Sequence, residues 1–172
     1  MKAKVIVVKV LAGLVLLGYG GLLLYWMFWG FGRSAHISGD FRYNIVPFET
    51  IQLFARSASW DNLRAPLINL AGNVAVFVPF GVLFPILFGK CRNYFGFLTR
   101  FLLFIVILEL AQGVLGAGVA DVDDVILNSI GASLGYIGYR LIAGPEQKRN
   151  GRAHARTRSA NARSRSGQER RR

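Results

Sequence analysis

The residues best suited to chemistry are acids and amides that recur in three short motifs. Within each motif they are spaced three or four apart: Asn69, Asn73; Glu109, Gln112; Asp121, Asp124, Asn128. Such spacings place the members of a motif on one face of a helix. Carboxylates and amides can hydrogen-bond a peptide or sugar group, hold a hard divalent cation, or divide the roles of acid and base.

Other kinds of site have few residues from which to be built. The chain has one cysteine, Cys91, and two histidines, His36 and His154. A zinc–thiolate site, an intrachain disulfide and a nucleophile activated by histidine are therefore not expected. There is also no glycine loop of the kind that cradles phosphates. We expect no cofactor, a non-enzymatic protein, and a surface thiol at Cys91, which lies between Lys90 and Arg92.

Four apolar runs must position the polar motifs. Of the 172 residues, 53% are hydrophobic. The runs long enough to cross a hydrocarbon core of about 30 Å as helices are Val5 to Trp29, Leu67 to Phe88, Phe97 to Leu115, and Val125 to Ala143. The first is too long for the apolar part of a cleaved signal peptide, and no small-x-small site follows it, so a retained helix is favoured. The sequence predicts an all-α, polytopic membrane protein with about four transmembrane helices.

The connection between the first two runs, residues 30–66, is polar but holds one amphipathic segment. Pro47 suits the first position of a helix. Phe48, Ile51, Phe54 and Ala55 then recur at helical spacing. We expect a short helix here, lying in the membrane interface.

The positions of Lys and Arg predict the orientation. Bases precede the first run, surround the turn at Lys90 and Arg92, and follow the fourth run, whereas the turn before the fourth run holds aspartates and no base. Four arginines in the first loop weaken this asymmetry without reversing it. Both termini are therefore expected in the cytoplasm.

The basic residues concentrate in a tail. Residues 148–172 hold ten of the 21 Lys and Arg residues and one acid, Glu169. The Arg, Ser, Ala and Gly composition of 145–172 cannot bury a core, so we expect this tail to be disordered and residues 1–144 to form the membrane domain. Basic clusters beside a membrane helix attract anionic lipid headgroups, a partner favoured here over nucleic acid.

The expected topology places the polar motifs at similar depths. With 1.5 Å of rise per residue, three residues lie about 10 Å inside the outer helix ends: Asn73, Glu109 and Asn128. One turn higher lie Asn69, Gln112 and Asp124. Because lipid penalises such groups, all three faces should turn inward around a polar pocket open to the outside.

Each polar residue also has a structural interpretation. Asp121 suits a helix cap, because acids satisfy the amides of a helix N-terminus. The asparagines suit hydrogen bonds between helices. Glu109 differs, because an acid inside a membrane is costly and is a functional hypothesis by default.

Small residues and a proline suit close helix packing. Gly131 and Gly135 form a G-x-x-x-G pair below Asn128, and Gly138 continues the stripe. Pro79 has no backbone N–H and so leaves the carbonyl of Ala75 without its helical donor. Inside a membrane that carbonyl needs a hydrogen bond from a neighbouring side chain. The residues assigned to helix packing are Pro79, Gly81, Gly131 and Gly135.

These motifs resemble the VanZ-like family of small bacterial membrane proteins. The resemblance covers roughly residues 40–140 and is carried by Asn44-Ile45-Val46-Pro47-Phe48, NLAGNVAVFVPFG (69–81), ELAQ (109–112) and DVDDVILNSIGASLGY (121–136). It implies an envelope protein of the bacterial cell membrane. Because the family's named member is associated with resistance to the glycopeptide teicoplanin, the resemblance also implies a link to that resistance.

The chain departs from the family pattern at one point. A basic residue, usually Arg, is expected shortly before the aspartates, but residues 116–120 contain none. The available substitutes are the arginines of the first loop: Arg33, Arg42, Arg56 and Arg64.

Three functions remain open. The leading hypothesis is a non-enzymatic envelope protein whose pocket binds a cell-wall precursor, a glycopeptide or another lipid-linked ligand. The second is a membrane enzyme that uses a metal on a phosphorylated lipid, and the third is a structural subunit without a ligand. If the pocket binds a ligand, Glu109→Gln and Asp124→Asn should abolish binding, whereas Asp123→Asn, on a different helix face, should be milder.

Overall fold

The computed structural model describes residues 2–30, 41–57 and 64–144. Its elements are, in chain order, α1 (Lys2–Phe28), β1 (Tyr43–Asn44), α2 (Glu49–Ser57), α3 (Arg64–Leu87), the 3₁₀ turn η1 (Gly89–Cys91), α4 (Tyr94–Val114), β2 (Ala120–Asp121) and α5 (Val122–Ala143). The all-α class is confirmed. The basic tail, Arg33 and both histidines lie outside the described residues.

Four of the described helices are long and apolar enough to cross a membrane: Ala3–Phe28, Leu67–Leu87, Tyr94–Val114 and Val122–Ala143. The four predicted spans are therefore confirmed. Two of them begin three residues earlier than predicted because polar residues cap them. The side chain of Asn93 accepts a hydrogen bond from the Gly96 amide (2.7 Å) at the start of α4, and Asp121 does the same for the Asp123 amide (2.9 Å) at the start of α5.

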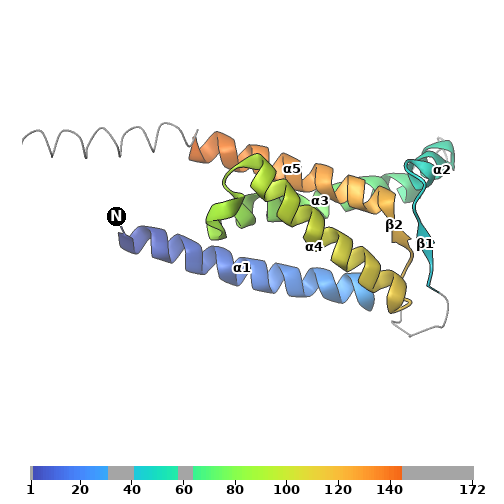
Figure 1. Cartoon of the computed structure of the whole chain (residues 1–172), viewed down its shortest axis with the longest axis horizontal. Helices are drawn as coiled ribbons and strands as arrows, with labels where there is room; N and C mark the ends of the chain where they lie inside the picture. Colours follow the sequence, from blue (N-terminus) through green and yellow to red (C-terminus); the bar gives the residue numbers. More distant parts are fainter. Residues whose placement is uncertain (1, 31–40, 58–63, 145–172) are drawn as a thin grey trace, which may run out of the picture. The chain divides into compact units, whose positions relative to one another are not determined.

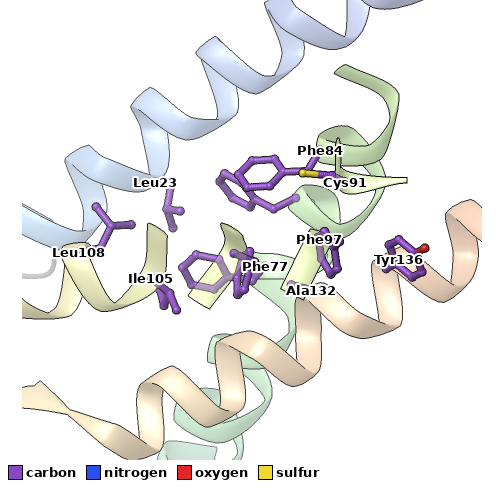
Figure 2. Close-up of a cluster of buried hydrophobic side chains, with 11 residues drawn as sticks. Leu23, Phe77, Phe84, Cys91, Phe97, Ile105, Leu108, Ala132 and Tyr136 are labelled. Carbon is purple, nitrogen blue, oxygen red and sulfur yellow. The ribbon is translucent and has the colours of Figure 1, made fainter. Parts of the chain in front are cut away.

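An aromatic core joins α3, α4 and α5 (Figure 2). The rings of Phe97 and Tyr136 stack with centroids 4.9 Å apart, and Phe80 and Phe101 are almost completely buried beside them. The turn η1 adds Cys91 to this cluster with no exposed surface. Our expectation of a surface thiol is therefore wrong, because the turn folds back against the helices and covers the sulfur.

Glycines bring α3 and α5 into backbone contact. A Cβ added at Gly131 would overlap the carbonyl of Val74, and one added at Gly135 would overlap that of Val78. From the other side, a Cβ at Gly81 would overlap the carbonyl of Ala132. The contact ends before Gly138, where an added Cβ would meet nothing within 4 Å. The helices thus approach where the sequence places these three glycines, but the predicted stripe is one glycine too long.

Most of α1 presents apolar side chains outward, and one polar contact ties it to α3. The hydroxyl of Tyr19 donates to the carbonyl of Val76 at 2.8 Å. We expected a side chain to reach the carbonyl of Ala75, which has no helical donor because Pro79 lacks a backbone N–H. Tyr19 reaches the carbonyl one residue further along the same helix.

The first loop folds onto the turn before α5. Strands β1 and β2 pair in parallel, Tyr43 with Ala120 and Asn44 with Asp121. The strands and α2 gather at the end where α1 and α4 finish and α5 begins (Figure 1). Helix α2 begins at Glu49, two residues after Pro47, because Phe48 adopts a left-handed conformation (φ 67°) that a helix excludes.

Helix α5 ends at a glycine. Gly144 has a φ of 70° and donates its amide to the carbonyl of Arg140 at 3.0 Å. This is the usual geometry of a glycine just past a helix C-terminus.

Candidate functional site

The aspartates of the DVDD motif hold the first loop in place. Asp121 is buried and its carboxylate accepts from the hydroxyl of Thr50 at 2.6 Å and the side-chain amide of Asn44 at 3.4 Å. The same carboxylate accepts the Asp123 amide, as a residue that caps α5 should. Asp121 therefore combines the predicted cap with contacts to residues more than 70 positions earlier in the chain.

Asp123 caps a different helix. Its side chain is 0% exposed, and its two oxygens accept the backbone amides of Phe48 at 2.6 Å and Ile51 at 3.0 Å. The amide of Phe48 immediately precedes α2 and that of Ile51 lies in its first turn, where backbone N–H groups have no partner within the helix. A negative carboxylate at that position also suits the helix dipole.

Sequence reasoning missed the importance of Asp123. It does lie on a different helical face from Asp124, but that face meets α2 and not solvent. The unpaired amides of a helix beginning after Pro47 were the available signal, because they require an acceptor from elsewhere in the chain. Sequence alone did not show which aspartate supplies it.

Asp124 and Asn73 form the direct polar link between α5 and α3. The side-chain amide of Asn73 donates to a carboxylate oxygen of Asp124 at 2.5 Å, and both residues are partly buried. We expected Asn73 at the depth of Glu109 and Asn128, one layer deeper than Asp124. The structure gives Asn73 a partner from the upper layer, in the first turn of α5.

Three polar residues predicted to face inward are buried. The exposed fractions are 4% for Glu109, 6% for Gln112 and 3% for Asn128. Gln112 donates its side-chain amide to the carbonyl of Met27 at 3.1 Å, which ties α4 to the last turn of α1. Carbonyls in the last turn of a helix have no partner within it, so this contact satisfies both groups.

Asn128 contains a buried polar atom without a partner among the described residues. Its side-chain oxygen makes no hydrogen bond within the described residues, and neither does the hydroxyl of the adjacent Ser129. Most buried polar groups in native proteins do have a partner, supplied by protein, water or ligand. Asn128 lies one helical turn below Asp124 on the same face of α5.

The remaining predicted residues stand apart from this group. Asn69 lies one turn above Asn73 on α3 and is partly buried. Gly81, Gly131 and Gly135 lie deeper, where α3 and α5 touch, and Pro79 lies two residues before Gly81 in α3. Of the described loop arginines, Arg42 contributes its backbone carbonyl to the amide of Ala120 at 3.0 Å, and Arg56 reaches Gln52 on its own helix at 3.4 Å.

The described acids do not assemble into a metal site. Across residues 2–30, 41–57 and 64–144, no three His, Cys, Asp or Glu side chains converge as ligands of one ion. Asp121 and Asp123 face the first loop, whereas Asp124 faces α3. The arrangement is suited to hydrogen bonding.

The chain is similar to a known protein family and to a curated bacterial protein. The family model described as VanZ/LLP1 matches residues 16–143. Protein VanZ of Enterococcus faecium is 36% identical over 76 residues, which cover 42% of this chain and 45% of that protein. The chain thus spans less than half the length of this curated relative. No solved structure matches the chain.

Proposed function

Because the chain belongs to the VanZ/LLP1 family, we propose that it is a non-enzymatic protein of the bacterial cell envelope that binds a cell-wall-related or lipid-linked ligand. Its four long apolar helices fit a multi-pass membrane protein. The proposed ligand site comprises Asn73, Asp124 and Asn128, with Asn69 above them and Glu109 at the depth of Asn128. The proposed consequence for the cell is altered susceptibility to the glycopeptide teicoplanin.

The observation that carries this proposal is the buried side-chain oxygen of Asn128, which has no hydrogen-bond partner in the described residues. An acceptor in this state takes a hydrogen bond from water or from a ligand. The nearby carboxylate of Asp124 is also an acceptor, and the amide of Asn73 is already directed at it. A buried acceptor such as the Asn128 oxygen suits a ligand that offers donors, such as the hydroxyls of a sugar or the amides of a peptide.

Binding is tested with the full chain in nanodiscs and a panel of lipid-linked wall precursors and teicoplanin. Asn128→Leu conserves shape and removes the acceptor. We expect it to abolish binding while leaving the thermal stability of the ligand-free protein equal or higher, because replacing an unsatisfied polar group relieves its desolvation cost. Asp124→Asn and Glu109→Gln should also lose binding, and Glu49→Gln on exposed α2 is the matched control.

The proposal is refuted if none of these ligands binds, or if Asn128→Leu binds as well as the parent. The cellular arm expresses parent and variants at equal levels in a susceptible bacterium and measures growth in teicoplanin. The parent should raise the tolerated concentration and Asn128→Leu should not.

A structural subunit without a ligand is the second candidate. It is favoured by the use of Asp121 and Asp123 as caps and ties, because the carboxylates of both residues are occupied by hydrogen bonds from the chain itself. In that case Asn128→Leu would change neither binding nor susceptibility, and Asp123 would be the more sensitive position.

The proposed orientation has both termini in the cytoplasm. An even number of spans returns the chain to its starting side, and the bases around Lys90 and Arg92 favour the cytoplasm for the turn between α3 and α4. A cysteine at Gly118 should therefore react with an impermeant reagent outside the cell. One at Asn150 should react only after permeabilisation, and reaction from outside would reverse the proposal.

A further inference from the structure

The segment from Phe41 to Ser57, which contains β1 and α2, exposes several large apolar side chains. Ile45 is 71% exposed and Leu53 66%, and Tyr43, Val46 and Phe48 are each more than half exposed. Single exposed apolar residues are normal on protein surfaces, but a concentration of them marks an interaction site. None of these five side chains is needed for the proposed ligand site.

The hydrogen bonds of this segment determine its level along the helices. Tyr43 pairs with Ala120, immediately before α5, and Asp123 in the first turn of α5 holds the start of α2. On the other side, a Cβ at Gly113 in the last turn of α4 would meet the ring of Phe41. The segment therefore lies at the ends of the membrane spans (Figure 1).

Aromatic residues of α1 indicate a membrane interface at the same end. Tyr25 and Trp26 lie in the last turn of α1, Trp29 follows it, and all three are exposed. Tyr and Trp are enriched where the hydrocarbon core meets the headgroups. The exposed apolar side chains of the segment are thus placed at headgroup depth and not far out in water.

Three exposed arginines accompany the apolar side chains. Arg42 precedes β1, Arg56 lies in the last turn of α2, and Arg64 begins α3. The exposed acid among the described residues of this region is Glu49. Exposed arginines beside apolar side chains are typical of elements that lie in a membrane surface and bind phosphate headgroups.

We propose that the segment from Phe41 to Ser57 is an interfacial anchor that binds the anionic phospholipid surface of the leaflet at this end. Thr50, Ile51 and Phe54 form the face of α2 that turns toward the protein. Leu53 and Ala55 are both exposed and lie on opposite flanks of that face, about 160° apart at ~100° per residue. The flank with Leu53 enters the lipid, and the flank with Ala55 faces water.

The test places one label on each flank of α2. Leu53→Cys and Ala55→Cys are made in a Cys91→Ala background, labelled with a polarity-sensitive fluorophore, and reconstituted as full chains in nanodiscs of phosphatidylcholine and phosphatidylglycerol. We expect iodide to quench the label at 53 severalfold less than the label at 55. Lipids with a nitroxide near the headgroup should quench the label at 53 more strongly.

The anionic component is tested by omitting phosphatidylglycerol. The emission of the label at 53 should shift toward that of a polar environment in phosphatidylcholine alone, and the triple variant R42Q/R56Q/R64Q should lose this dependence on lipid. Equal iodide quenching at 53 and 55 would overturn the proposal. So would a label at 53 that neither iodide nor nitroxide lipid reaches, because a second protein would then cover this flank. Emission indifferent to lipid charge would overturn the anionic headgroup as the partner.

Discussion

Replacing Asp123 with Asn is the most informative perturbation of the fold around the candidate site. The carboxylate is fully buried and accepts one backbone amide on each oxygen, from Phe48 and Ile51. Asn preserves the volume and one acceptor, but it presents an NH₂ group to the second backbone amide, and two donors then face each other.

The magnitude follows from these two contacts. A hydrogen bond to a charged acceptor is worth roughly 1.5–3 kcal/mol, and a buried donor left without a partner costs about 1–3 kcal/mol. Because Asn keeps one of the two contacts, we expect Asp123→Asn to lower the free energy of unfolding by about 2–4 kcal/mol. The loss is local, since the aromatic core between α3, α4 and α5 does not involve Asp123.

The assay measures two quantities in nanodiscs, the stability of the protein and the release of the first loop. Thermal unfolding reports the stability, and limited proteolysis reports release of the segment from Phe41 to Ser57 while the four spans remain inserted. Glu49→Gln is the control, because it removes an exposed carboxylate from the first turn of α2, next to the amides that Asp123 accepts. If Asp123→Asn changes stability no more than Glu49→Gln does, and protease resistance is unchanged, the capping argument is wrong.

Three further predictions follow from the packing. Gly135→Ala should lower the free energy of unfolding by about 1–3 kcal/mol, because its Cβ would overlap a carbonyl of α3. Gly138→Ala should be nearly neutral in the same unfolding assay. Equal effects of the two substitutions would contradict the close contact between the helices. Tyr19→Phe should cost about 0.6 kcal/mol, the average for a hydrogen bond between membrane helices, and a larger loss measured by unfolding would point to an added role for the hydroxyl. Burial raises the pKa of the Cys91 thiol, an effect that Arg100 partly opposes. Maleimide should therefore label the native protein far more slowly than the unfolded protein at the same pH. Equal labelling rates would show that the turn η1 opens freely.

The sequence determined the features that depend on local composition. Apolar runs as long as the hydrocarbon core predicted the four spans, because span length depends on rise per residue and not on partners. The family resemblance was likewise readable from contiguous motifs and is confirmed by the match over residues 16–143. The spacing of Gly131 and Gly135 placed the glycines that the structure brings against α3.

Only the tertiary structure decided which residues meet. Helical periodicity assigned Asp123, Asp124 and Asn73 to faces, but it did not show what lies opposite each face. Asp123 meets the start of α2, 75 residues earlier in the chain, and Asn73 meets Asp124, 51 residues later. Cys91 is buried for the same reason, because a turn between two basic residues folds back onto an aromatic cluster built from other helices. Such contacts depend on crossing angles and loop closure, which no spacing within a single helix encodes.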